Sequence, residues 1–225
     1  MIDRIFQRAV RVVKGRELDL DSRVPYSYLV EIALLNMVAL ARGMIRLREK
    51  VLLGRHVRLL GKTKMRLSKG VAIGDFCCID SEGIDGISIG SGSSIGAFSF
   101  LKVSGTLTDL GKGIHIGSNV GIGEFAHIGG AGGVDIGDDT IAGAYLSIHP
   151  ENHVFNDTTQ PIRQQGITRN GIRIGRNCWI GAKVTILDGA VIGSNSVIAA
   201  GAVVKGEFPE GVIIGGVPAK LLGEI

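Results

Sequence analysis

The sequence predicts an all-β solenoid whose coils are built from a six-residue repeat. Residues 172–205 carry the clearest copies, in which an aliphatic side chain recurs at every sixth position: Ile174, Ile180, Ile186, Ile192, Ile198 and Val204. A small or medium side chain stands two residues before each of the last five: Cys178, Val184, Ala190, Ser196 and Ala202. Because side chains alternate between the two faces of a strand, both positions are predicted to point inward and to stack from coil to coil.

The glycine content supports the same fold. Each repeat is expected to give one short strand and one tight corner, so that three repeats close a turn of the solenoid. Gly and Asn between the repeats, as in Gly193-Ser194-Asn195, supply positive backbone dihedrals at low cost. A helical fold would need apolar residues at three- and four-residue spacing, and the 35 glycines would destabilise it.

Composition limits the class of protein. Of the 225 residues 45% are hydrophobic and only 5% are aromatic, which suits a narrow aliphatic core and excludes a disordered chain. The three cysteines, Cys77, Cys78 and Cys178, form no even-numbered framework, so we expect a reduced, cytoplasmic chain. The first nineteen residues lack a long apolar core followed by a cleavage site, so no secretory signal is expected.

Residues 1–50 lack the repeat and are predicted to form a helical N-terminal segment. Residues 1–70 hold sixteen Lys and Arg against six Asp and Glu, a net charge of +10, whereas the remainder carries −6. This basic end suggests contact with acidic material such as membrane phosphates, or simply a solvated cap. A helix is expected over residues 26–48, with apolar runs that Glu31, Asn36 and Arg42 make too short to span a bilayer. It is predicted either to cap the solenoid or pack on a partner, or to lie on a membrane surface.

Residues 51–225 are predicted to form the solenoid, with interruptions. Inward positions are expected at these residues: Val57, Ile73, Ile79, Ile89, Ile95, Leu101, Leu107, Ile116, Ile122, Ile128, Val134, Ile136, Ala142 and Ile148. Residues 80–88 and 108–115 break the spacing, and a two-residue slip separates Val134 from Ile136. The repeat then vanishes over residues 149–171, a polar stretch with two prolines and two histidines. Loops of this length are usually functional or disordered, so we predict an active-site loop here.

These features together resemble the hexapeptide-repeat acyltransferases. The resemblance rests on the repeats, the looped-out histidine segment, the block NCWIGAKVTILDGAVIGSNSVIAAGAVV and the ending GGVPAKLL. It covers residues 51–225 and is strongest to the maltose- and galactoside-type O-acetyltransferases and those of polysaccharide biosynthesis. It implies a left-handed parallel β-helix, acetyl-CoA as acyl donor, a sugar or glycan acceptor, and a homotrimer with sites between subunits.

Histidine suits the chemistry that the resemblance implies. A sugar hydroxyl needs a general base as it attacks a thioester, and the pKa of histidine lies near the working pH. Counting from Ile136 as in the family reaches His153, within an Asn-His pair that looks like the acetyltransferase motif. His149 remains the alternative because it precedes Pro150, like the His-Pro of the sugar acetyltransferases. His127 is expected to point outward from the wall, where it could approach the loop.

The resemblance also implies where the coenzyme lies. Trp179 directly precedes an inward isoleucine, so it should face out of the solenoid, where the family places a tryptophan along the coenzyme between two subunits. Small residues would line the same groove, and two lysines would lie near the adenine and phosphate end: Gly181, Ala182, Ala200, Gly201, Lys205 and Lys220.

The acceptor side is the least determined. Gly123 and Ala131 replace the polar residues of some sugar acetyltransferases, so the acceptor cannot be carried over. Arg163 and Gln165 in the loop are the candidates for acceptor contacts, with Gln164 beside them. Three other functions stay open: an N-acyltransferase acting on an amino sugar nucleotide, a non-catalytic scaffold, and a metalloenzyme like the γ-class carbonic anhydrases. For the last, His127, His149 and His153 would supply ligand types.

Overall fold

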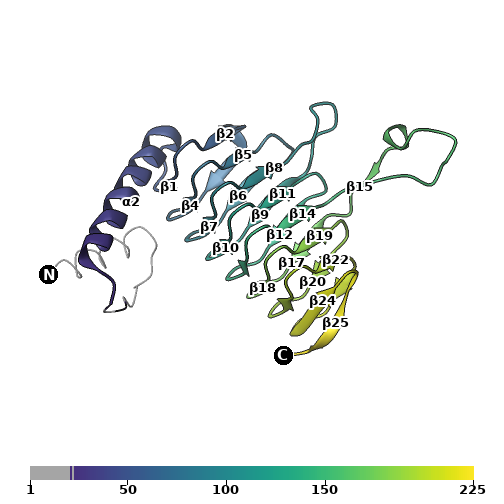
Figure 1. The fold of residues 1–225 in the computed structure, drawn as a ribbon. Helices are drawn as coiled ribbons and strands as arrows, with labels where there is room; N and C mark the ends of the chain where they lie inside the picture. The colour runs from purple at the N-terminus through teal and green to yellow at the C-terminus, as the bar shows by residue number, and fades with distance from the viewer. Residues whose placement is uncertain (1–20, 22) are drawn as a thin grey trace.

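The chain folds into a left-handed parallel β-helix with one long helix at its N-terminal end (Figure 1). The computed structural model describes residue 21 and residues 23–225. The expectation of no secretory signal and the first twenty residues of the predicted N-terminal segment lie outside this range.

Three parallel sheets form the walls of the solenoid, and each successive coil adds one strand to each sheet. Sheet A has nine strands, the last of them antiparallel: β1 Leu52–Leu53, β4 Ala72–Ile73, β7 Ser94–Ile95, β10 Gly121–Ile122, β13 Ile141–Ala142, β18 Trp179–Ile180, β21 Val197–Ile198, β24 Val212–Gly216 and β25 Ala219–Glu224. Sheet B has seven: β2 Arg58–Leu60, β5 Cys78–Asp80, β8 Phe100–Lys102, β11 His127–Gly129, β14 Ser147–His149, β19 Thr185–Leu187 and β22 Val203–Val204.

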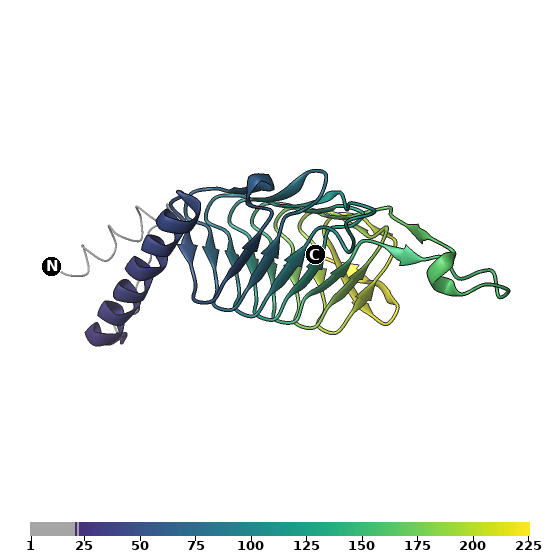
Figure 2. The same cartoon turned by 90° about the horizontal axis from the view of Figure 1, so that it is seen from above.

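Sheet C also has seven strands: β3 Met65–Leu67, β6 Gly86–Ile89, β9 Gly113–Ile116, β12 Val134–Ile136, β17 Ile172–Ile174, β20 Val191–Ile192 and β23 Glu207–Phe208. A separate two-stranded hairpin, β15 Asn152–His153 with β16 Ile167–Thr168, projects from the solenoid (Figures 1 and 2). The remaining elements are the helix α2, Tyr26–Leu47, and two 3-10 turns, η1 Lys62–Lys64 and η2 Ile162–Gln164.

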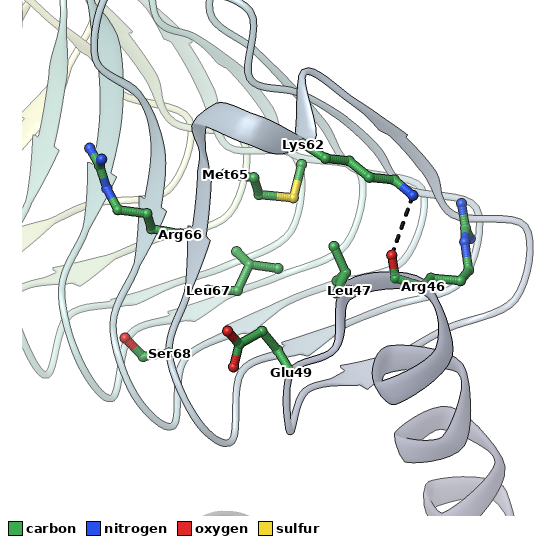
Figure 3. Close-up of a pocket in the computed structure, with 8 residues that line it drawn as sticks. All are labelled: Arg46, Leu47, Glu49, Lys62, Met65, Arg66, Leu67 and Ser68. Atoms are coloured by element: carbon green, nitrogen blue, oxygen red, sulfur yellow. Dashed lines mark hydrogen bonds between the residues drawn. The ribbon is translucent and has the colours of Figure 1, made fainter.

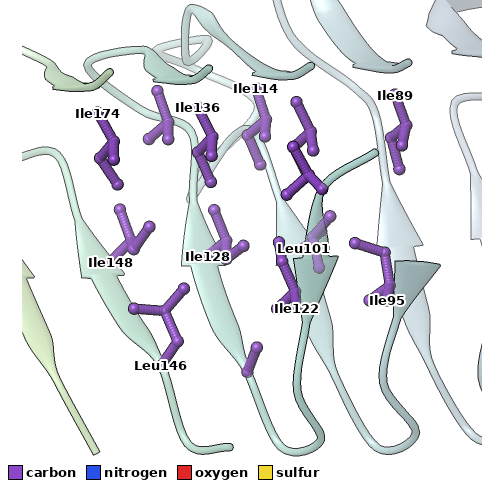
Figure 4. Packing of buried hydrophobic residues seen from close by; sticks show 14 of the residues in the cluster. Ile89, Ile95, Leu101, Ile114, Ile122, Ile128, Ile136, Leu146, Ile148 and Ile174 are labelled. Carbon is purple, nitrogen blue, oxygen red and sulfur yellow. The ribbon is translucent and has the colours of Figure 1, made fainter. Parts of the chain in front are cut away.

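The core is a stack of aliphatic side chains along the solenoid axis (Figure 4). All six repeat positions from Ile174 to Val204 are buried, as are the five smaller residues that precede them by two. Ile128 pairs with Ile148 in register, so the stacking predicted across the slip at Val134–Ile136 is confirmed. Leu107 departs from the prediction: its side chain is 81% exposed, because residues 103–112 leave the wall as a loop.

The corners explain where the few aromatic residues go. Asn177 and Asn195 have positive φ and hydrogen-bond to each other, as corner asparagines were expected to do. At another corner the positive-φ positions are instead taken by rings that stack with centroids 4.9–5.1 Å apart: His56, Phe76, Phe98, Phe125 and Tyr145. Stacking from coil to coil offsets the strain of positive φ at a non-glycine residue. We call this row the corner ladder.

The helix α2 is attached to the first coil at its C-terminal end. Arg42 donates a hydrogen bond to the Leu53 carbonyl (2.9 Å), and Arg46 donates one to the Val57 carbonyl (2.8 Å). Gly43 is buried because the helix meets the chain at Val51, where a Cβ would overlap the Val51 carbonyl. Among the described residues, α2 is the one helix long and apolar enough to cross a membrane by length and composition. The helix as a whole passes this test, while Glu31, Asn36 and Arg42 still divide it into shorter apolar runs.

Candidate active site

The polar stretch that interrupts the repeat forms a hairpin arm. The chain leaves the wall after β14, runs out along β15, turns back through η2 and returns along β16 to β17 (Figure 2). Asn152 pairs with Thr168 and His153 with Ile167. The arm therefore carries His153 on a short, hydrogen-bonded strand, and the His153 side chain is exposed.

A carboxylate and a guanidinium fix the base of this arm. The Asp188 carboxylate, which is 3% exposed, accepts hydrogen bonds from the backbone N–H groups of Asn170 (2.9 Å) and Gly171 (2.8 Å). Arg169 forms ion pairs with Glu151 (3.2 Å) and with Asp109 (3.0 Å), which belongs to the loop of residues 103–112. The two loops that leave the solenoid are thus joined by one guanidinium. Sequence reasoning missed both contacts, since nothing in the repeat marks Asp188 or Arg169.

A pair of stacked histidines lies on sheet B where the arm begins. The ring centroids of His127 and His149 are 5.5 Å apart, and His127 also stacks on Phe100 at 5.6 Å. His149 Nε2 is 2.7 Å from the Ser147 hydroxyl, so this hydrogen bond holds its ring. Partial burial lowers the pKa of His127, and the neighbouring His149 lowers it further. Both effects favour the neutral imidazole of His127.

The two candidate bases differ in their surroundings. His149 lies on the wall, where it is exposed but held by Ser147 and stacked on His127. His153 lies on the arm with its side chain open to solvent. Of the two acceptor candidates, Arg163 is exposed, whereas the Gln165 amide bonds the backbone N–H and carbonyl of Asp157 (3.0 and 2.7 Å) and helps to close the arm.

The residues predicted to hold the coenzyme lie on another part of the wall. Trp179 faces outward from sheet A and is 57% exposed, beside the exposed Ile141 on the neighbouring strand. Ala182, Ala200 and Gly201 are exposed where the chain passes from sheet A to sheet B. The fold itself requires glycine at position 181, because a Cβ there would lie 2.5 Å from the Ala200 nitrogen on the next coil.

The predicted site residues do not all meet within one chain. Trp179 lies on sheet A, whereas His149 lies on sheet B and His153 on the arm. Lys205 follows β22 of sheet B and Lys220 lies in β25 of sheet A, both exposed. Within residues 21 and 23–225 of a single chain, no group of three His, Cys, Asp or Glu side chains is placed to hold a metal ion.

Residues 171–206 match the family model of the bacterial transferase hexapeptide repeat. The chain resembles the hexapeptide-repeat acyltransferases. It is 33% identical over 124 residues to WbbJ of Escherichia coli (strain K12), a protein named for O-acetyl transfer in lipopolysaccharide biosynthesis, covering 52% of this chain and 63% of WbbJ. It is 34% identical over 121 residues to galactoside O-acetyltransferase of the same organism, covering 51% and 56% of the two chains.

A solved structure has the same fold. AntD, an N-acyltransferase from Bacillus cereus crystallised with dTDP and coenzyme A, aligns with a TM-score of 0.53 at 20% identity over 91% of each chain. At 20% identity this likeness shows the fold alone. The hexapeptide-repeat chain described here spans less than two thirds of the length of both curated relatives.

Proposed function

We propose that this chain is an acetyl-CoA-dependent O-acetyltransferase acting on a hydroxyl of a sugar or glycan in surface polysaccharide biosynthesis. The observation that carries the proposal is the arm with His153, which leaves a hexapeptide-repeat wall directly beside the His127–His149 pair. The names of the two relatives, both O-acetyltransferases, support the reaction class.

His153 is the proposed general base. Its exposed side chain is available to accept the acceptor's hydroxyl proton, whereas His149, which is also exposed, already shares a hydrogen bond between Nε2 and the Ser147 hydroxyl. As the proton moves to His153, the acceptor oxygen bonds to the acyl carbon and the carbon–sulfur bond breaks. The imidazolium then returns its proton to the thiolate that leaves, so His153 ends as it began. His149 and His127 act as positioning residues at the root of the arm.

Acetyl-CoA supplies the activated acyl group. The exposed Trp179 ring and the small side chains of Ala182, Ala200 and Gly201 leave room for a narrow chain to lie against the backbone of the wall. Lys205 and Lys220 are exposed cations suited to phosphate groups. Arg163 is the arm's proposed contact with the acceptor.

We further propose a homotrimer whose sites lie between subunits, in the cytoplasm. The histidines and Trp179 lie on different walls of one chain, so a site that uses both needs a second copy. The exposed rings of the corner ladder leave apolar wall that such a copy would cover.

The test is a thiol-release assay with acetyl-CoA and a panel of galactosides, oligosaccharides and amino sugar nucleotides. His153→Ala should lower kcat by on the order of 10²–10⁴-fold, the usual effect of losing positioned proton transfer. The melting temperature and the Kd for acetyl-CoA should barely change, because His153 lies on the arm and not in the core. Ser68→Ala, at an exposed site on the first coil, is the matched control.

The same assay separates the alternatives. If His149→Ala is inactive while His153→Ala remains active, the base is His149. Mild alkali releases an O-acetyl ester but not an amide, so an alkali-stable product formed only from amino sugars would replace this proposal with N-acylation. No thiol release with any acceptor would overturn the acyltransferase assignment.

A further inference from the structure

The helix α2 exposes an apolar face that the fold leaves uncovered. Six large apolar side chains lie at positions i, i+4, i+7, i+8, i+14 and i+15, which share one side of a helix, and are 44–81% exposed: Val30, Leu34, Met37, Val38, Met44 and Ile45. We call them the apolar face. Gly43, which the first coil covers, lies on the opposite side. Tyr26 and Tyr28, also exposed, flank the N-terminal end of the helix.

The first coil next to α2 carries a concentration of positive charge. Residues 42–70 hold ten Lys and Arg against the single Glu49, a net charge of +9: Arg42, Arg46, Arg48, Lys50, Arg55, Arg58, Lys62, Lys64, Arg66 and Lys69. We call these ten residues the basic collar. Only two of them form ion pairs among the described residues, Arg55 with Asp75 and Lys64 with Glu82. Eight are exposed, all but Arg42 and Lys64.

A pocket lies within the collar, beside the C-terminal end of α2. It measures about 310 Å³ and lies between the end of α2 and the first coil (Figure 3). Three cations line it, Arg46, Lys62 and Arg66, together with the carboxylate of Glu49, Ser68 and the apolar side chains of Leu47, Met65 and Leu67. Three cations against one carboxylate, beside apolar side chains, suit a group that is anionic at one end and apolar at the other.

We propose that this end of the solenoid docks on an anionic phospholipid membrane, with α2 lying in the interface. The apolar face enters the boundary between headgroups and acyl chains, while the basic collar contacts lipid phosphates. A spanning orientation would place Glu31 in the hydrocarbon layer and release the hydrogen bonds of Arg42 and Arg46 to the first coil. The arm lies away from α2 along the solenoid (Figure 2). It would therefore stay in water while the other end is docked.

The test is co-sedimentation of the full chain with vesicles of phosphatidylcholine, alone or mixed with phosphatidylglycerol. The chain should bind the mixed vesicles far more tightly, and high salt should release it. Leu34→Glu/Val38→Glu should abolish binding to both kinds of vesicle. The control pair Leu107→Glu/Phe155→Glu adds the same charge at apolar residues that are at least as exposed, on loops away from α2, and should bind like the unchanged chain.

A second comparison isolates the collar. Lys50→Gln/Arg58→Gln/Lys69→Gln should weaken binding to the anionic vesicles by on the order of 10²-fold, from about 1 kcal/mol per cation. Lys112→Gln/Arg173→Gln/Arg176→Gln removes the same charge from exposed positions beyond the collar and should have little effect. Melting curves check that all four variants fold.

Four results would overturn the proposal. One is no binding of the unchanged chain to anionic vesicles, and another is equal losses in the control variants. In the third, Leu34→Glu/Val38→Glu changes the oligomeric mass but leaves vesicle binding intact. The apolar face would then be an interface with a second copy of the chain. Retention on vesicles through high salt and alkaline carbonate would instead identify a spanning anchor. Acyl transfer between soluble substrates is measured separately, so its failure would not affect this test.

Discussion

His127 lies between Phe100 and His149 on the outer wall of sheet B, and its environment favours the neutral form. We predict by NMR titration a pKa below the usual value of about 6.5. His149→Gln should raise the pKa of His127 towards that value, because it removes the neighbouring charge but leaves most of the burial. As pH falls, the unfolded chain takes up this proton first, so His127 makes folding less favourable in acid. A midpoint at or above the usual value would contradict the observed packing.

The Trp179 ring projects outward from sheet A and is not part of the core. An exposed tryptophan of this kind is usually covered by a partner subunit or a ligand. Trp179→Ala should weaken acetyl-CoA binding by about 1–3 kcal/mol, as expected for a packed aromatic contact. Calorimetry measures this, with Ile84→Ala as the control for an exposed apolar side chain elsewhere. Unchanged affinity in an assembly of unchanged mass would exclude Trp179 from the donor site.

At the scale of single residues, the sequence predicts inward positions well and outer contacts poorly. The aliphatic repeat from Ile174 to Val204 is governed by strand alternation, a local property, and every position is buried as predicted. The bonds of Arg169 and Asp188 join segments brought together only after the loops return to the wall. Such contacts leave no periodic signal. The corner ladder was missed for a related reason, because positive φ at aromatic residues is supported only by stacking on other coils.

The conformation of the arm depends on the contacts where it rejoins the solenoid. Asp188 is nearly buried and accepts the N–H groups of Asn170 and Gly171 where the arm rejoins the solenoid. Asp188→Ala would leave these donors without their acceptor, at a cost of about 1–3 kcal/mol in the free energy of unfolding. Denaturant titration measures this loss, and kcat should fall because His153 is held by the same arm. Asp188→Asn retains one acceptor oxygen and should lose less. Equal stability of Asp188→Ala and the unchanged chain would show that the hydrogen bonds to the Asp188 carboxylate do not hold the arm.

The six-residue repeat predicts where the loops interrupt the solenoid, but not how those loops fold. A loss of period at residues 108–115 and 149–171 marks where the chain leaves the wall. The loss of period does not predict that residues 149–171 fold as a hairpin. It also does not predict that Asp109 of the loop at residues 103–112 forms an ion pair with Arg169 of the arm. Leu107 shows the limit of the period, since it continues the spacing by count yet lies in the loop at 81% exposure.

At the scale of the molecule, the solenoid separates the two proposed activities along its axis. The first coil and α2 carry the apolar face and the basic collar, whereas the arm and Trp179 belong to later coils (Figure 1). Parallel strands lie about 4.8 Å apart, so four steps from β2 to β14 set the histidine wall roughly 19 Å from the first coil. A rigid stack of this kind holds the proposed transfer site at a fixed distance from whatever the first coil contacts.

The proposed assembly gives the last prediction, because a site shared between copies can be rebuilt from two defective chains. Light scattering should give three times the chain mass, and His153→Ala and Trp179→Ala should each be impaired at low acetyl-CoA concentration. Coexpressed, the two variants form mixed trimers in which an unaltered arm from one copy can face an unaltered wall from the next. Roughly a quarter of the sites should then be intact, as random mixing around a closed ring requires. If the site lay within one chain, no mixed assembly would contain an intact site, and activity would stay at the mean of the two variants.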